Sequence, residues 1–115
     1  MAFTKIEISH IESAMSDFLE IRRPPADRRA QFDITYRIDG LSVILMDRHP
    51  LWRDSSQIVE EPFAKTTYVR KANRWLIYWK RADHKWHTYE PQPEVQYFED
   101  FLELVDADEY SCFWG

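Results

Sequence analysis

The sequence predicts an α+β fold: an N-terminal helix, a five-stranded antiparallel meander sheet and a C-terminal helix, in a single domain over residues 1–115. Apolar residues recur with helical spacing near both ends of the chain, whereas between them they alternate with polar residues. Short turn signals separate the alternating runs. Aromatic residues make up 16% of the chain, enough ring area to give a small sheet a dense core or to leave rings over for a recognition surface.

The first helix is predicted over residues 5–22. Thr4 and Glu7 have capping-box spacing, so each side chain can bond the backbone N–H of the other. Pro24 and Pro25 end the helix, because proline lacks the N–H and disfavours helix in the preceding residue. The apolar positions fall on one face: Ile8, Ile11, Met15, Phe18 and Leu19.

The middle of the chain predicts five strands. Asp39–Gly40 indicates a tight hairpin after the first of them, since a type I′ turn needs positive φ at both central residues. Residues 47–59 contain Pro50, Asp54 and paired serines, so we expect a long loop there. A second helix is predicted near 95–105, after two prolines that end the sheet. The expected strands lie near 32–38, 41–46, 62–71, 74–81 and 85–90.

The strand 74–81 has apolar residues on both faces. Trp75, Ile77 and Trp79 point one way, and Leu76 and Tyr78 point the other. A strand that is covered on both sides tends to be central in its sheet. Two helices can cover one face of five strands. The other face would need the 48–61 loop, the C-terminal segment or a second subunit.

Charge is divided unevenly along the chain, whose net charge is −5. Residues 65–89 hold seven bases against Asp83 alone, and residues 90–115 hold eight acids and no base. We expect the acidic segment to fold back over the basic one; the alternative is a basic binding surface that the acidic segment guards. Either way, the ring-rich ending should be anchored. We expect Phe113 and Trp114 to pack on the sheet or first helix, with three acids near bases of 65–85: Asp106, Asp108 and Glu109.

Several classes of protein are excluded by pattern. No run approaches the ~18 apolar residues of a membrane span, and the start lacks a secretory signal, so we expect a cytoplasmic protein with no membrane role. Cys112 alone can form neither an intramolecular disulfide nor a structural zinc site.

Catalytic and metal motifs are weak, so we expect no catalytic set, no metal site and no cofactor. His84 and His87 would face opposite sides of a strand. Glu60, Glu61 and Lys65 lack the spacing of a nuclease site, and the two glycines of the chain make no phosphate loop. The sequence thus leans away from an enzyme. A small-molecule or hydrolytic site remains a third hypothesis, built on Arg81, Asp83, His87 and Tyr89.

The segment 74–91 concentrates rings and bases. Bases interleaved with aromatic residues are typical of single-stranded nucleic-acid platforms, because bases contact phosphates and rings stack on nucleobases. Tryptophan in a strand is, however, more often part of a core. The candidate binding residues in and near this segment are Arg70, Lys80, Arg81, Asp83, His84, Lys85, Trp86, His87 and Tyr89.

Several segments from Arg23 onward form a recognisable pattern. They are Arg23–Pro24–Pro25, the strand Phe32–Gly40, Glu61–Pro62 with Ala64–Lys65, Trp75 to Trp79, the run Arg81 to His87, Tyr89–Glu90–Pro91 and the ending Cys112 to Gly115. In these segments the sequence resembles a bacterial family known as domain of unknown function 3024. The resemblance implies a small bacterial protein and carries no activity, cofactor or catalytic residue.

These observations favour a non-enzymatic protein-interaction module that binds an unknown protein partner or a second copy of itself. The uncovered, ring-rich sheet face is the expected contact surface. The alternative, from a different class, is a nucleic-acid-binding protein that uses the basic 65–89 surface. Steep salt dependence of oligonucleotide binding would separate the two.

Overall fold

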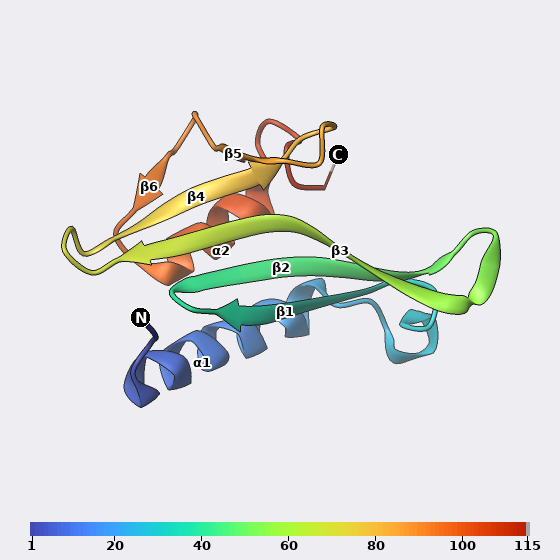
Figure 1. The fold of residues 1–115 in the computed structure, drawn as a ribbon. Helices are drawn as coiled ribbons and strands as arrows, with labels where there is room; N and C mark the ends of the chain where they lie inside the picture. The colour runs from blue at the N-terminus through green and yellow to red at the C-terminus, as the bar shows by residue number, and fades with distance from the viewer. Residues whose placement is uncertain (115) are drawn as a thin grey trace.

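Two helices pack against an antiparallel sheet in the computed structural model, which describes residues 1–114 (Figure 1). The strands follow one another as a meander, β1-β2-β3-β4-β5, and the two-residue β6 pairs with β4. This confirms the predicted α+β fold and adds one short strand. The elements are α1 (Lys5–Arg22), the 3-10 turn η1 (Ala26–Arg28), β1 (Asp33–Asp39), β2 (Ser42–Leu51), β3 (Asp54–Val69), β4 (Arg74–Lys80), β5 (Trp86–Thr88), β6 (Glu94–Val95) and α2 (Phe98–Ala107).

Helix α1 begins and ends where the sequence predicts. The backbone N–H of Glu7 donates to the Thr4 hydroxyl at 3.2 Å, and the N–H of Thr4 donates to the Glu7 carboxylate at 2.8 Å. This reciprocal capping box satisfies two N–H groups that a helix start otherwise leaves unpaired. The helix buries one face on the sheet, through Ile11, Met15 and Phe18.

The core lies between the sheet and the two helices. From β4 it takes Trp75, which is 8% exposed, and Ile77, which is fully buried. Trp79 is half-buried and packs against the same cluster. Helix α2 closes this side with four buried side chains: Phe98, Phe101, Leu102 and Val105.

The prediction of a long loop at 47–59 is wrong. Strand β2 continues to Leu51 and β3 starts at Asp54, so this stretch forms a β-hairpin arm that extends beyond the helices (Figure 1). Pro50 lies within β2, opposite Ile58, and the pairing register shifts beside it. At the tip, Asp54 accepts hydrogen bonds from the backbone and hydroxyl of Ser56. The turn-forming residues therefore shape the end of a hairpin and do not prevent strand pairing.

The C-terminal segment is anchored, as expected. Phe113 is buried and its ring lies 5.0 Å from that of Tyr89. Trp114 donates its indole N–H to the Val105 carbonyl at 2.7 Å, and its ring lies 4.7 Å from Phe63. The Asp108 carboxylate accepts hydrogen bonds from the backbone N–H groups of Phe113 and Trp114, which fixes the last turn after α2.

The expected pairing of this acidic segment with the bases of 65–85 is wrong. Asp106 binds Arg22 of α1, and Glu99 lies 3.0 Å from His10 of the same helix. Asp108 is used for the turn itself. Within residues 1–114 no ion pair joins the basic segment 65–89 to the acidic residues that follow it. Acids of α2 therefore pair with α1, whereas its apolar side chains pack on β4.

No helix in the described part of the chain is both long enough and apolar enough to cross a membrane.

Candidate binding surface

The nine candidate residues from the sequence do not form one site. Lys80 and Trp86 lie on the sheet face opposite the helices. Five others belong to the turn that joins β4 to β5 or flank it: Arg81, Asp83, His84, Lys85 and His87. Arg70 and Tyr89 hold the fold together.

Arg70 ties α1 to the end of β3. Its guanidinium donates to both carboxylate oxygens of Glu7, at 2.8 and 2.9 Å, and to the carbonyl of Ala2. The Arg70 hydrogen bond is the main reason why the pKa of Glu7 falls to about 2. Both terminal nitrogens of the Arg70 guanidinium are thus already hydrogen-bonded within the protein. Its role is to position the start of α1.

Tyr89 belongs to the core. It is 2% exposed and packs against Phe113, and burial raises the pKa of its phenol. A ring enclosed in this way has almost no surface to offer a ligand, and Tyr89 serves the packing of the core.

The β4–β5 turn is organised by Asp83. Its carboxylate accepts the backbone N–H of Lys85 at 2.9 Å and lies 2.8 Å from Nε2 of His87. These contacts, the Lys85 N–H first, lower the pKa of Asp83. His84 takes the left-handed conformation, with φ of 61°, that the tight turn needs. The Asp83–His87 contact thus belongs to the turn's own hydrogen bonding.

A polar groove of about 500 Å³ lies beside this turn, lined by Trp79, Arg81, His87 and Cys112 among others. Arg81 stacks on Trp79, with 5.5 Å between the guanidinium carbon and the ring centroid. Burial raises the pKa of the Cys112 thiol, which keeps it protonated and a poor nucleophile at neutral pH. The groove therefore offers no activated thiol.

The other sheet face carries rings and bases together. Strand pairing places Arg37, Ile44, Lys65, Tyr78 and Thr88 opposite one another in turn, in a single row across β1 to β5. Directly opposite residues on neighbouring strands point to the same face. The Lys65 ammonium lies 4.8 Å from the centroid of the Tyr78 ring. The row therefore forms one continuous surface.

Trp86 crosses this row from the edge strand β5. Its ring centroid lies 5.0 Å from the Lys65 ammonium and 5.4 Å from that of Lys80. Burial beside these rings lowers the pKa of Lys65. Cation–π contacts of this kind hold the lysines against the rings. We call this surface the platform, and define it as Arg37, Ile44, Met46, Lys65, Leu76, Tyr78, Lys80 and Trp86.

The platform is apolar at its centre and basic around it. Ile44 and Met46 are each 6% exposed although they lie on the side away from the helices. Three platform residues are bases, and β1 adds two acids to the same face: Asp39, and Asp33, which is paired with Arg23. Within residues 1–114 no helix or loop covers this face, which is turned toward the viewer in Figure 1.

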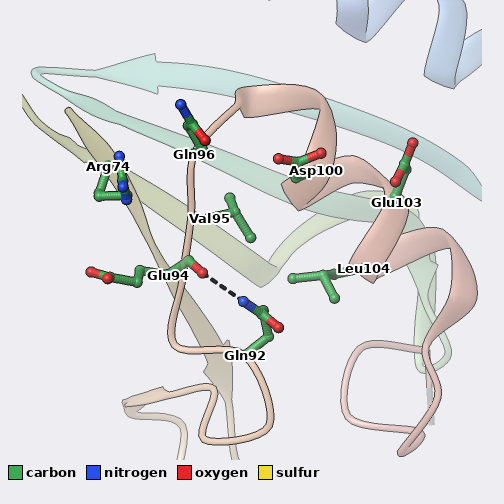
Figure 2. A pocket seen from close by; sticks show the side chains of 8 residues that line it. All are labelled: Arg74, Gln92, Glu94, Val95, Gln96, Asp100, Glu103 and Leu104. Carbon is green, nitrogen blue, oxygen red and sulfur yellow. Dashed lines mark hydrogen bonds between the residues drawn. The ribbon is translucent and has the colours of Figure 1, made fainter.

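A second groove, of about 560 Å³, lies between β6 and α2 (Figure 2). Asp100 and Glu103 reach it from α2, Glu94 comes from β6 and Arg74 from β4. Asp100 also accepts the backbone N–H of Tyr97 at the helix start. Three carboxylates against one guanidinium favour cationic ligands here, and the sequence reasoning did not single this groove out.

Sequence reasoning also missed a group of metal-ligating side chains at the base of the hairpin arm: Asp47, His49 and Glu61. The sequence pattern predicts a loop at 47–59, which separates these residues, whereas the pairing of β2 with β3 brings them together. The signal present in the sequence is the Asp-x-His spacing, which puts two ligands on one face once the stretch is recognised as a strand.

Together these features define a class: a small α+β protein with two helices on one sheet face and rings and bases on the other. The chain belongs to the family described as a domain of unknown function, DUF3024, which it matches over residues 3–115. This confirms the resemblance found in the sequence. Neither curated proteins nor solved structures gave a match.

Proposed function

We propose that this protein is a non-enzymatic interaction module whose platform docks an acidic segment of a partner protein. The single observation that carries the proposal is a ring- and base-bearing sheet face that the described chain leaves uncovered. Of the three covers expected from the sequence, the 48–61 stretch forms the arm and the C-terminal segment packs on the helix side. A second polypeptide remains as the cover.

The partly exposed apolar residues of the platform support a protein partner. Leu76, Tyr78 and Trp86 supply apolar surface, which suits a desolvated contact between side chains. In a nucleic-acid platform the ring faces must be free to stack on bases. Here the Lys65 ammonium already occupies positions over the Tyr78 and Trp86 rings, so base stacking would first have to displace it.

The charge of the platform favours a foreign, acidic partner over a second copy. A two-fold symmetric dimer pairs the same patch with itself. Arg37, Lys65 and Lys80 would then face one another with Asp39 as their nearest acid on the face, and like charges across an interface are unfavourable. An acidic segment would instead place carboxylates beside these bases while its apolar residues contact Leu76 and Trp86.

Nucleic acid is the second candidate, and one observation favours it. Arg37, Lys65 and Lys80 lie on a sheet face that also bears Tyr78 and Trp86, and bases beside rings are the elements of a single-strand binding surface. Displacement of Lys65 from the rings by phosphate would free both ring faces for stacking.

The test compares two charge-reversal variants. Arg37→Glu with Lys80→Glu alters the platform, and Arg28→Glu with Lys71→Glu is the matched control, with one arginine and one lysine that are exposed outside the sheet strands. Each full-length protein is used as bait in an extract of its native cell. We expect specific proteins that the wild type and the control capture and the platform variant loses. The same captured set for all three baits would overturn the proposal.

The same proteins are then titrated against a labelled single-stranded oligonucleotide of mixed sequence at low and high salt. We expect weak binding that Arg37→Glu with Lys80→Glu changes no more than the control does. Tight binding that falls steeply with salt and is lost only in the platform variant would establish the nucleic-acid candidate instead. A concentration-dependent dimer in sedimentation that the platform variant abolishes would establish self-association.

A further inference from the structure

Three metal-ligating side chains converge at the base of the hairpin arm. Asp47 and His49 are two residues apart on β2, so they share a face, and Glu61 of β3 lies directly opposite Asp47. Nε2 of His49 is 3.6 Å from Oδ1 of Asp47 and 4.0 Å from Oε2 of Glu61. All three ligand atoms lie within 4.8 Å of one another.

One oxygen of the Asp47 carboxylate has no hydrogen-bond partner in the described chain. This oxygen, Oδ1, is buried. Burial raises the pKa of Asp47, and this outweighs the lowering by nearby His49; Glu61 adds a smaller rise. An unsatisfied buried oxygen is costly. A cation beside Oδ1 would satisfy it.

His49 presents a lone pair to the two carboxylates. Its Nδ1 lies 3.1 Å from the carbonyl oxygen of Pro50, and because a carbonyl can only accept, Nδ1 carries the proton. In the neutral ring Nε2 is then the acceptor. Three acceptors, Nε2 and two carboxylate oxygens, therefore lie within 4.8 Å of one another, and a cation between them would stabilise this arrangement. A backbone bond at the other ring nitrogen is also the usual support of a metal-bound histidine.

The geometry points to a site for one divalent transition-metal ion of the Zn²⁺ type, held by Asp47 Oδ1, His49 Nε2 and a carboxylate oxygen of Glu61. Tetrahedral ligands at Zn–N and Zn–O distances near 2.0–2.1 Å are about 3.3 Å apart, so the two distances from His49 Nε2 need only a small contraction. The two carboxylates balance the charge of the ion, and water completes its shell.

Neighbouring residues limit the site to these three ligands. Glu60 lies next to Glu61 but faces the opposite side of the strand, where it pairs with Arg48 at 3.4 Å. The exposed fractions of the Asp47, His49 and Glu61 side chains are 25%, 35% and 63%, so solvent can deliver a hydrated ion. A bound ion would join β2 to β3 where the arm leaves the helices.

The test is a titration of the metal-stripped full chain with ZnCl₂ by calorimetry, and with CoCl₂ by visible absorption. We expect one equivalent to bind and to raise the unfolding temperature. His49→Gln and Glu61→Gln should each weaken binding at least ~10-fold, since loss of even an outer-shell partner typically costs ~10–100-fold in metal affinity. The control is His87→Gln, which breaks another histidine–carboxylate contact and should bind as the wild type does.

Two results would overturn the site. One is the lack of saturable Zn²⁺ and Co²⁺ binding by the wild type while His49 titrates by NMR as an imidazolium, which would make a proton the cation of the cluster. The other is equal loss of affinity in His87→Gln and His49→Gln, which would indicate scattered surface binding. Because Glu61→Gln keeps the imidazole, a folding defect confined to the histidine variant cannot produce the expected pattern.

Discussion

The ion pair between Glu7 and Arg70 makes the start of α1 sensitive to acid. The pKa of Glu7 in the folded protein is about 2, below the ordinary 4.5, chiefly because Arg70 donates to the ionised carboxylate. A lowered pKa means that the charged form stabilises the folded state. This contribution is complete above about pH 4.5 and is lost as the pH falls from about 4.5 to about 2.

We therefore expect the free energy of unfolding to fall more steeply in the wild type than in Glu7→Gln across that pH window. Urea unfolding at a series of pH values measures the difference. Glu12→Gln, an exposed change on the same helix, should follow the wild type. Parallel curves for the wild type and Glu7→Gln would show that the pair contributes nothing to the fold.

Trp75 is the ring around which the helix-side core is built. Its centroid lies 4.9 Å from Tyr68, 5.2 Å from Phe98 and 5.7 Å from Phe3, which joins β3, β4, α2 and the N-terminal segment. Trp75→Ala should destabilise the fold by about 3–5 kcal/mol, because it removes a large buried side chain and leaves a cavity. Trp52→Ala is the matched control: Trp52 is 88% exposed at the arm tip, and its loss should change stability by less than about 0.5 kcal/mol. Equal denaturation midpoints for both variants would contradict this core.

Among the elements, the C-terminal segment can be used to test two hypotheses: that its rings dock it on the fold, or that it guards a basic surface. If its rings serve to dock it, Phe113→Ala should cost about 3–5 kcal/mol in denaturant unfolding and leave oligonucleotide binding unchanged. Tyr110→Ala, at a ring that is 59% exposed in the same segment, should be near neutral. If the segment instead guards a basic surface, Phe113→Ala would be stable and bind a single-stranded oligonucleotide more tightly. That outcome would support the alternative, in which the acidic segment covers a basic ligand site and moves away when the ligand binds.

The elements differ in how far they could be predicted from sequence. Helix α1 and the β1–β2 turn were predictable because Thr4, Glu7 and Gly40 act locally, through caps and a positive φ. The arm was not, because most of its side chains are exposed on both faces and give no alternation of apolar and polar residues. Pro50 and the serines then resemble a loop, although β2 and β3 pair through them.

The platform was half predictable for a related reason. Lys80 and Trp86 stand out in the ring-rich segment, but their partners Lys65 and Ile44 join them only through the register of β2, β3 and β4. Register depends on pairing across the sheet and not on local sequence. The Asp47–His49–Glu61 cluster arises in the same way.

For the molecule as a whole, charge is sorted by face and not neutralised along the chain. Acids of α2 meet α1 through His10–Glu99 and Arg22–Asp106, so the acidic segment serves helix packing. The bases of the platform are left facing solvent beside Tyr78 and Trp86. This separation is what gives a protein of net charge −5 a surface suited to an anionic partner.

The most direct measurement is lysine and tryptophan footprinting by mass spectrometry, on the purified protein alone and after its addition to native extract. The account predicts that acetylation of Lys80 and oxidation of Trp86 fall in the extract, with or without nuclease, because a protein partner covers the platform. Lys71 and Lys85, in the turns at the two ends of β4, should be labelled equally in both samples. Equal labelling of all four residues with and without extract would contradict the account, and protection that nuclease removes would assign the face to nucleic acid.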